Sequence, residues 1–445
     1  MVNRAFSAPG KALLVGGYLV LDPQYRSYVV ALSSRMHAVV SQAAPCDEKS
    51  FKVTIKSSQF NSDEWNYMIA GEAPFEVREL DGRKNPFAEK VVEVIMNYCQ
   101  PSPTETGDIL VEVYSDPGYH SVGTSMLKRN SYKEFRFHDE TITKVPKTGL
   151  GSSAGLVTVL VSALLSIFKP SLNVRAEKDL VTIHNLSQVA HCQAQGKVGS
   201  GFDVAAAVFG SIMYQRFDPE LINNLPAANS IHYAQALRKL VDETDWKFEH
   251  ENITLPPGFR LIMGDVNNGS ETTKLVAKVK AWYDLNYPRS LDIYQKINEG
   301  NVSFIEGIGK LASFSKESPS EYNCMLQSLN SGADFETYDI IKQIRQAVDQ
   351  VRAKFRLITD ESGADIEPPV QTQLLDQSLN LKGVLTGMVP GAGGFDAISL
   401  IVTDNSDIPS QTRNDGKFSS VTWLNLRQQN TGVKEEIPEH YDKFT

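Results

Sequence analysis

The residues with the clearest chemical potential form the segment Pro146-Lys147-Thr148-Gly149-Leu150-Gly151-Ser152-Ser153-Ala154-Gly155. An apolar run from Leu156 to Phe168 follows and predicts a buried helix, so this segment would form the helix's N-terminal turn. Glycines let backbone N–H groups approach a polyphosphate closely, and the helix dipole favours negative charge there. The Ser152 and Ser153 hydroxyls can bind a phosphate or a phosphate-bound Mg²⁺. The segment predicts a nucleotide-phosphate loop, with a serine-capped tight turn as the alternative.

Two familiar phosphate-binding patterns do not describe this loop. No Gly-Lys-Ser/Thr closes it, as a P-loop would require. Ala154 stands where a dinucleotide-binding G-x-G-x-x-G pattern has its last glycine. The loop therefore belongs to another class of nucleotide site.

The composition is typical of a globular protein large enough for two domains. The 445 residues include 41% hydrophobic and 22% charged residues, with a net charge of −9 that argues against a general nucleic-acid binder. The four cysteines (Cys46, Cys99, Cys192 and Cys324) lie far apart, which argues against a zinc site or a disulfide framework. Gly16-Gly17 interrupts the apolar stretch Leu13–Leu21, and Leu156–Phe168 is too short to span a bilayer. We expect a soluble, cytoplasmic chain without membrane insertion.

Strand and helix patterns alternate in each half of the chain, which predicts an α/β or α+β fold with two domains and a cleft. Proline-rich stretches place the boundary so that residues 1–225 form one domain and 226–445 the other. In the first, strands at 4–7 and 12–15 would flank Pro9-Gly10-Lys11, a turn that exposes the lysine, and helices are expected at 86–98, 156–168 and 176–195. In the second, we expect a strand at 259–265, helices at 271–283 and 338–355, and strands at 381–388 and 395–402.

Three ordered motifs and an aspartate carry a family resemblance. The motifs are Ala8-Pro9-Gly10-Lys11 with Gly16-Gly17-Tyr18, the glycine loop, and Pro390-Gly391-Ala392-Gly393-Gly394-Phe395; the aspartate stands in Gly201-Phe202-Asp203. Together they resemble the galactokinase, homoserine kinase, mevalonate kinase and phosphomevalonate kinase (GHMP) superfamily. The segments 190–197, 264–273 and 362–372 are similar to the phosphomevalonate kinase branch in its fungal form.

This resemblance implies an α+β two-domain GHMP kinase fold, with an N-terminal domain like ribosomal protein S5 domain 2 and a ferredoxin-like C-terminal domain. It implies ATP- and Mg²⁺-dependent phosphorylation of (R)-5-phosphomevalonate to (R)-5-diphosphomevalonate in isoprenoid and sterol synthesis. Lys11 and Asp203 would be catalytic, residues 147–155 would bind ATP, and Ser152 or Ser153 would touch the metal. The expected substrate-binding residues are Lys11, Ser270, Thr272, Gly391, Ala392, Gly393 and Gly394.

The acceptor changes what Asp203 has to do. The second pKa of a phosphate monoester is about 6, so the acceptor is mostly a dianionic nucleophile near neutral pH. We expect Asp203 to orient Lys11 and the acceptor, with less need for a general base. The alternative is an aspartate that caps the following helix.

Two positions depart from the family pattern. Mevalonate kinases carry a Mg²⁺-binding glutamate upstream of the aspartate, but this chain has no glutamate between Glu177 and Asp203. His191, Gln193 and Gln195 are the polar candidates there, and we favour structural roles for His184 and His191, seven residues apart. Gly17 replaces the glutamate of a Gly-Glu pair found in many relatives.

A basic stretch before the glycine loop has two interpretations. Residues 120–147 contain six basic and three acidic side chains, typical of a solvated insert, with a phosphate-facing lid as the alternative.

Three other functions compete with the one that the resemblance implies. They are an alcohol kinase (mevalonate or a sugar), diphosphomevalonate decarboxylase, and a ligand-sensing regulator that binds ATP without turnover.

Overall fold

The computed structural model describes residues 3–45, 49–61, 63–120, 123–146, 148, 150–266, 272–332, 337–424 and 426–445, with only the backbone at position 273. The chain divides into two compact units that alternate along the sequence. Unit 1 contains the chain up to Lys11, residues 31–252 and the segment from Gln429 onward. Unit 2 contains Ala12–Val30 and Ile253–Gln428. The predicted division at 225/226 stays a prediction about domains.

Unit 1 is built on a large, mostly antiparallel sheet. Its main path runs β10-β9-β2-β6-β3-β4-β5, with β1 pairing with β2 and β16, and β15 pairing with β2. The C-terminal β16 pairs antiparallel with β1 so that Ala5 faces Glu436 and Ser7 faces Lys434. Three strands of this sheet, β1, β2 and β15, include residues that belong to unit 2. The strands are β1 (Asn3–Val15), β2 (Ser27–Gln42), β3 (Ser50–Ser57), β4 (Asp63–Ala70), β5 (Val77–Glu79), β6 (Ile109–Ser115), β9 (Ile212–Gln215), β10 (Glu249–Asn252), β15 (Gln428–Gln429) and β16 (Lys434–Glu436).

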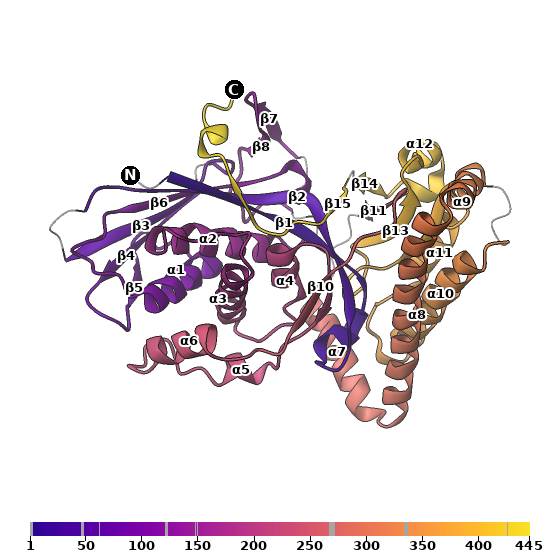
Figure 1. Ribbon diagram of the computed structural model, residues 1–445, viewed down its shortest axis with the longest axis horizontal. Helices are drawn as coiled ribbons and strands as arrows, with labels where there is room; N and C mark the ends of the chain where they lie inside the picture. Colours follow the sequence, from indigo (N-terminus) through magenta and orange to yellow (C-terminus); the bar gives the residue numbers. More distant parts are fainter. Residues whose placement is uncertain are drawn as a thin grey trace. The chain divides into compact units, whose positions relative to one another are not determined.

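Helices cover one face of this sheet, and Figure 1 shows α1, α2 and α3 side by side against it. The helix α2 is buried on nearly every side because its sequence is apolar or small throughout. In α1, Asn85 caps the start by accepting from the Ala88 N–H, and Pro86 occupies the first turn. The helices are α1 (Pro86–Cys99), α2 (Ser152–Phe168), α3 (Glu177–Gln195), α4 (Phe202–Phe209), α5 (Glu220–Asn223) and α6 (Tyr233–Asp242), with a 3₁₀ turn η2 at Pro117–Tyr119 and another, η4, at Pro438–Tyr441.

Unit 2 combines a four-stranded antiparallel sheet, in the order β12-β13-β11-β14, with a layer of helices. Two long helices, α8 and α10, run alongside each other (Figure 1). Gly307 of α8 permits this approach, because a Cβ there would lie 2.5 Å from Ile344 of α10. The elements are η1 (Gly17–Leu21), β11 (Phe259–Asp265), α7 (Thr272–Leu285), α8 (Arg289–Glu317), α9 (Pro319–Ser331), α10 (Asp339–Ser362), α11 (Pro369–Ser378), β12 (Val384–Met388), β13 (Ala397–Thr403), α12 (Ile408–Thr412), η3 (Gly416–Phe418) and β14 (Thr422–Leu424).

The predicted turn at Pro9-Gly10-Lys11 is wrong. The strand β1 runs without a break from Asn3 to Val15, and residues 5–10 are buried. Pro-Gly suggested a turn from local preference, but sheet pairing on both sides and burial of the flanking apolar residues outweigh that preference. Lys11 therefore sits on a strand instead of a solvent-facing turn.

The basic stretch forms a hairpin in unit 1, built from β7 (Ser125–Arg129) and β8 (Glu134–His138). Its cations contact nearby groups: the Lys128 ammonium lies 4.8 Å from the centre of the Phe137 ring, and Lys133 pairs with Glu436 at 3.2 Å. These contacts support the interpretation as a structural insert. The lid alternative remains a prediction for kinetics to test.

Candidate active site

The glycine loop and strand β1 meet at Lys11. The Lys11 backbone N–H donates to the Leu150 carbonyl at 3.1 Å. Gly151, the residue before α2, has a φ of 77°, and a Cβ there would lie 2.8 Å from the Lys11 Cε. Only glycine combines this backbone conformation with room for the lysine stem. The sequence therefore places the Lys11 side chain across the start of the helix.

Burial and Asp203 act in opposite directions on Lys11. Burial lowers the pKa of the Lys11 ammonium, and the negative charge of Asp203 opposes that shift. The ammonium also lies 5.4 Å from the centre of the Phe202 ring, which adds a cation–π contact. The site is poorly solvated, so an electrostatic interaction between protonated Lys11 and an anion would be strong there.

Asp203 stands in the first turn of α4, after a loop held by three side chains. Gln188 donates to the Gly201 carbonyl at 2.8 Å, Tyr214 to the Ser200 carbonyl at 3.0 Å, and Arg216 to the Gly199 carbonyl at 2.6 Å. The Asp203 Oδ1 accepts from the Val204 N–H at 3.0 Å. This bond lies within the first turn of α4, whose N-cap residue is Gly201 and has no side-chain cap, so the alternative of a capping aspartate stays a prediction.

A third helix brings His191 to the same place. Its Nε2 lies 3.1 Å from the Ser153 Oγ and 3.9 Å from the Asp203 Oδ2. The sequence favoured a structural role for His191, because its contacts with Ser153 and Asp203 join three segments that are distant in the chain. His184 lies two turns earlier on the same helix and is fully buried. Its ring nitrogens form hydrogen bonds with Asn185 and Gln188. Burial lowers the pKa of His184 to about 3.

The rest of the predicted ATP loop is anchored at its start. Thr148 donates its N–H to the Tyr119 carbonyl at 3.2 Å and its hydroxyl to the Gly118 carbonyl at 2.6 Å. Gly155 lies within α2, where a Cβ would approach Met36 to 2.8 Å, so glycine lets the helix pack closely on β2. Ser152, Ser153 and Ala154 form the first turn of α2. Lys147 and Gly149 lie outside the described residues.

A hollow of about 560 Å³ opens beside this helix start, also in unit 1. Ser152 and Ser153 form part of its wall, and aromatic and polar side chains from other elements complete it. This size and mixture are typical of a site for a small molecule. Sequence patterns did not indicate the hollow, whose lining comes from six separate segments: Met36, Trp65, Lys84, Asn85, Pro86, Phe87, His120, Ile142, Thr143, Val145, Ser152, Ser153 and Leu156.

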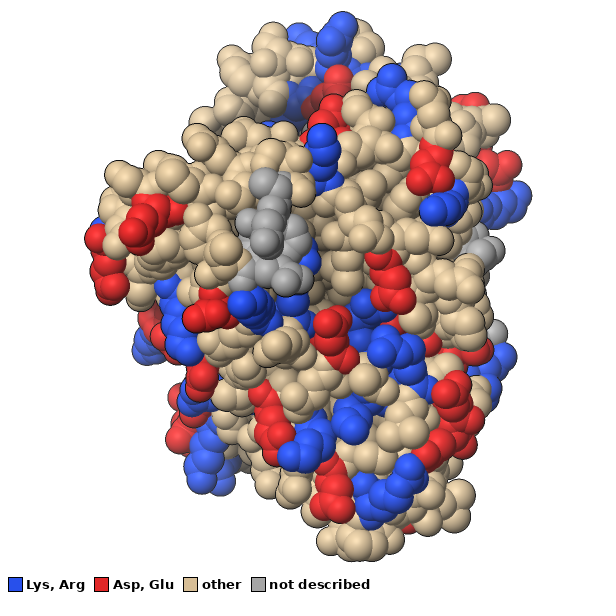
Figure 2. Space-filling model, turned by 90° about the vertical axis from the view of Figure 1, so that its right-hand side faces the viewer, with Lys and Arg blue, Asp and Glu red and all other residues tan. Residues whose placement is uncertain are grey.

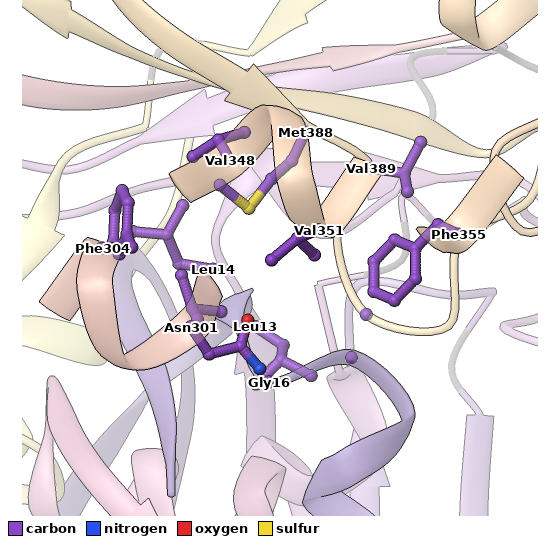
Figure 3. Close-up of a pocket in the computed structure, with 13 residues that line it drawn as sticks. Leu13, Leu14, Gly16, Asn301, Phe304, Val348, Val351, Phe355, Met388 and Val389 are labelled. Carbon is purple, nitrogen blue, oxygen red and sulfur yellow. The ribbon is translucent and has the colours of Figure 1, made fainter. Parts of the chain in front are cut away.

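In unit 2 the structure brings the Gly16-Gly17 pair and the third glycine motif together. The Tyr18 hydroxyl donates to the Ala392 carbonyl at 2.8 Å, and the Gly391 N–H donates to the Leu13 carbonyl at 3.4 Å. The Gly16-Gly17 pair and Gly391 line a small cavity of about 20 Å³. Figure 3 shows Phe355, Val351 and Met388 in its wall. A Cβ at Gly17 would lie 2.4 Å from the Phe355 ring, so this chain has no space for the glutamate of many relatives.

Two backbone N–H groups of the third motif already donate hydrogen bonds to carbonyl groups of the chain. The Gly393 N–H donates to the Pro390 carbonyl at 3.1 Å, and the Gly394 N–H donates to the Ile366 carbonyl at 2.9 Å. Phosphate binding by Gly391, Ala392, Gly393 and Gly394 stays a prediction. Thr272 begins α7 and is exposed, whereas Ser270 lies outside the described residues.

The described residues include no group of three His, Cys, Asp or Glu side chains that could hold a metal ion. Hydroxyls at a phosphate-binding helix start suit Mg²⁺ that arrives with a nucleotide, because Mg²⁺ keeps much of its coordination to water and phosphate. Ser152 and Ser153 fit that mode of binding.

The fold and the domain model define the class of protein. The family model for the GHMP kinases N terminal domain matches residues 123–211, which include the glycine loop and Asp203. The solved Streptococcus pneumoniae phosphomevalonate kinase in complex with phosphomevalonate and AMPPNP has the same fold, with a TM-score of 0.60 and 17% identity. That alignment covers 96% of this chain and 100% of the other. The architecture is that of a GHMP kinase.

Sequence relatives narrow the class to one family. The phosphomevalonate kinase of Candida albicans is 42% identical over 448 residues, covering 99% of each chain. Phosphomevalonate kinase erg8 of Aspergillus fumigatus is 33% identical, covering 98% of this chain and 97% of the relative. The chain belongs to the phosphomevalonate kinase family, as the resemblance of its motifs predicted.

Proposed function

We propose that this chain transfers the γ-phosphoryl group of ATP to (R)-5-phosphomevalonate, giving (R)-5-diphosphomevalonate and ADP. The observation that carries the proposal is the meeting of Lys11, the start of α2 and Asp203 in a chain related over its full length to phosphomevalonate kinases. Because the family's reaction serves isoprenoid synthesis, a place in the mevalonate pathway and in sterol formation follows.

The proposed ATP site combines the helix start and the hollow beside it. Backbone N–H groups at the start of α2 and the positive end of its dipole would bind the phosphates. Trp65 and Phe87 in the hollow offer aromatic surface on which a purine can stack. Mg²⁺ on the phosphates would be touched by Ser152 or Ser153 and would neutralise charge on the transferred group.

The acceptor needs little activation. A phosphate oxygen of the dianionic acceptor attacks the γ-phosphorus, the new O–P bond forms, and the bond to the β-phosphate oxygen breaks to release ADP. Lys11 would neutralise charge as the two polyanions approach. Asp203 raises the pKa of Lys11 against the effect of burial and so helps to keep it protonated. This supports an orienting, electrostatic role for Asp203.

The helices, the surface charge and the cysteines bear on the partners and the compartment of the chain. Within the described ranges, no helix is long and apolar enough to cross a membrane. Lys and Arg side chains are interspersed with Asp and Glu over the face in Figure 2, unlike the one-sign surface of a nucleic-acid binder. The cysteines Cys99, Cys192 and Cys324 are free thiols, which fits a reducing compartment such as the cytoplasm.

The test is an ADP-release assay with ATP and Mg²⁺ that compares phosphomevalonate, mevalonate and galactose as acceptors. Turnover with phosphomevalonate alone is the expected result. Turnover with an unphosphorylated alcohol would replace the proposal by an alcohol kinase. Nucleotide binding without turnover of any acceptor would indicate a ligand-sensing regulator.

A further inference from the structure

The His191 side chain contacts both Ser153 of the proposed nucleotide loop and Asp203, whereas the sequence favoured a structural role for it. It comes from α3, whereas Ser153 opens α2 and Asp203 opens α4. One imidazole nitrogen, Nε2, faces both partners, at 3.1 Å from the Ser153 Oγ and 3.9 Å from the Asp203 Oδ2. The first distance is a hydrogen bond, and the second is an electrostatic contact.

The ring is held in a single orientation. His191 is 4% exposed, and its ring stacks on Phe87 of α1, with centroids 5.5 Å apart and planes inclined at 27°. Phe87 and Ser153 both line the hollow beside the loop. Because Phe87 fixes the plane of the imidazole, the Nε2 edge stays directed at the serine.

The neighbouring carboxylate bears on which ring nitrogen of His191 carries the proton, because Nε2 can donate or accept according to the tautomer. A negative charge 3.9 Å from Nε2 favours the tautomer that carries its proton on that nitrogen. The Nε2–H then donates to the Ser153 Oγ, so the serine's own O–H is free to turn toward a phosphate oxygen. Without this donor, the serine hydroxyl could rotate among its staggered positions.

We propose that His191 is a positioning residue for the phosphoryl-transfer reaction, acting through Ser153 on the nucleotide phosphates. The inference rests on the proposed function, because it takes the start of α2 as the phosphate site. It also gives a physical role to a polar residue in the region where this chain lacks the glutamate of mevalonate kinases. The ligand class is a nucleoside triphosphate.

His184 provides a matched control on the same helix. It is also buried, and its ring stacks on Phe248 at 4.2 Å, but its hydrogen-bond partners are Asn185 and Gln188. None of these partners is a proposed phosphate ligand. Replacement of either histidine removes a buried ring from α3, and only the loss of His191 should alter nucleotide kinetics.

The first experiment compares H191L, H191Q and H184L. We expect H191L to lower kcat by about 10–100-fold, the range found when a residue that orients a ligand-binding group is removed, and to raise KM for ATP. KM for phosphomevalonate should stay unchanged. H191Q, whose amide N–H can reach the Nε2 position, should recover most of kcat, and H184L should lower thermal stability with kcat unchanged. Equal effects of H191L and H191Q on kcat would overturn the proposal.

A double-mutant cycle with S153A tests the proposed route. If His191 acts through the Ser153 hydroxyl, H191L should cost almost nothing further once that hydroxyl is gone. Additive losses in kcat would overturn this role. The same cycle, read as the Kd of Mg²⁺ and a non-hydrolysable ATP analogue by calorimetry, needs no acceptor. If the wild-type protein binds the analogue but does not phosphorylate phosphomevalonate, the proposed function is refuted, and the binding cycle still decides the role of His191. If the wild-type protein does not bind the analogue, the proposed function and the role of His191 are both refuted.

Discussion

Two cations, Arg352 in unit 2 and Lys11 in unit 1, have pKa values that are shifted in opposite directions. Arg352 in unit 2 donates to both Glu367 oxygens, at 2.8–3.2 Å, and to Asp376 at 2.8 Å. Burial alone would lower its pKa, but these partners raise the pKa of Arg352 above its ordinary value. Lys11 in unit 1 has a lowered pKa, because burial outweighs the charge of Asp203.

We interpret this difference in pKa as the difference between a structural charge, Arg352, and the charge that we propose for catalysis, Lys11. The Arg352 charge is satisfied within the chain, so its removal should affect folding. Lys11 lies at the start of α2, close enough to Asp203 to feel its charge, and we propose that its own charge there attracts a polyanionic substrate. A protein that holds a lysine with a lowered pKa at such a position would forgo some stability for that function.

The largest expected effect comes from removal of the functional charge. K11M should lower kcat by about 10³-fold, or about 4 kcal/mol of transition-state stabilisation, because a preorganised positive group is lost. Its thermal midpoint should equal or exceed that of the wild type, because a charged Lys11 with a lowered pKa opposes folding at neutral pH. Steady-state kinetics and calorimetry measure the two effects. K296M, at an exposed lysine, is the control, and a K11M protein that unfolds earlier with kcat intact would contradict the comparison.

Loss of a partner of the structural charge, Arg352, should lower the stability of the fold and leave kcat nearly unchanged. E367Q leaves the Arg352 guanidinium buried with less compensation, and should lower the free energy of unfolding by about 3 kcal/mol. Denaturant unfolding gives this value, and kcat per folded molecule should change little. E361Q removes the partner of the exposed Arg289 and should cost less than about 1 kcal/mol. Similar losses of unfolding free energy in E367Q and E361Q would show that burial does not determine how much each ion pair contributes to stability.

A smaller effect is expected where the C-terminal segment pairs with β1. Burial raises the pKa of Glu436, but the Ser7 hydroxyl and Lys133 outweigh it and lower the pKa to about 2 from 4.5. The carboxylate therefore stabilises the fold above pH 4.5, and this contribution is lost as the pH falls toward 2.

E436Q tests this contribution. It should cost about 1–2 kcal/mol at pH 7, and this cost should shrink below pH 4.5 and nearly vanish only at about pH 2 and below, where the folded wild-type carboxylate becomes protonated. Thermal unfolding at several pH values measures the difference. E435Q, at the adjacent and more exposed glutamate, is the control, and an E436Q deficit that persists unchanged at low pH would contradict the account.

Sequence patterns predicted the chemistry of the site better than its geometry. The glycine loop and the helices around it were predicted because glycine spacing and apolar periodicity are local signals. Asp203 was identified through the resemblance to the GHMP kinase motifs, and its catalytic role stays a prediction. The environment of Lys11 was predicted wrongly, since Pro9-Gly10 indicates a turn locally while sheet pairing extends β1 through it. The contacts of His191 and the pairing of Glu436 with Ala5 join segments distant in sequence, which a single sequence does not reveal.

The most direct test of the electrostatic account is the pH dependence of kcat/KM for phosphomevalonate in D203N. The account predicts an acidic limb that stays at about pH 6, because it reflects the second ionisation of the acceptor phosphate. It also predicts an alkaline limb that moves to lower pH, because Asp203 no longer raises the pKa of Lys11. A D203N enzyme whose acidic limb disappears while the alkaline limb stays in place would show that Asp203 is the general base, and would contradict the account.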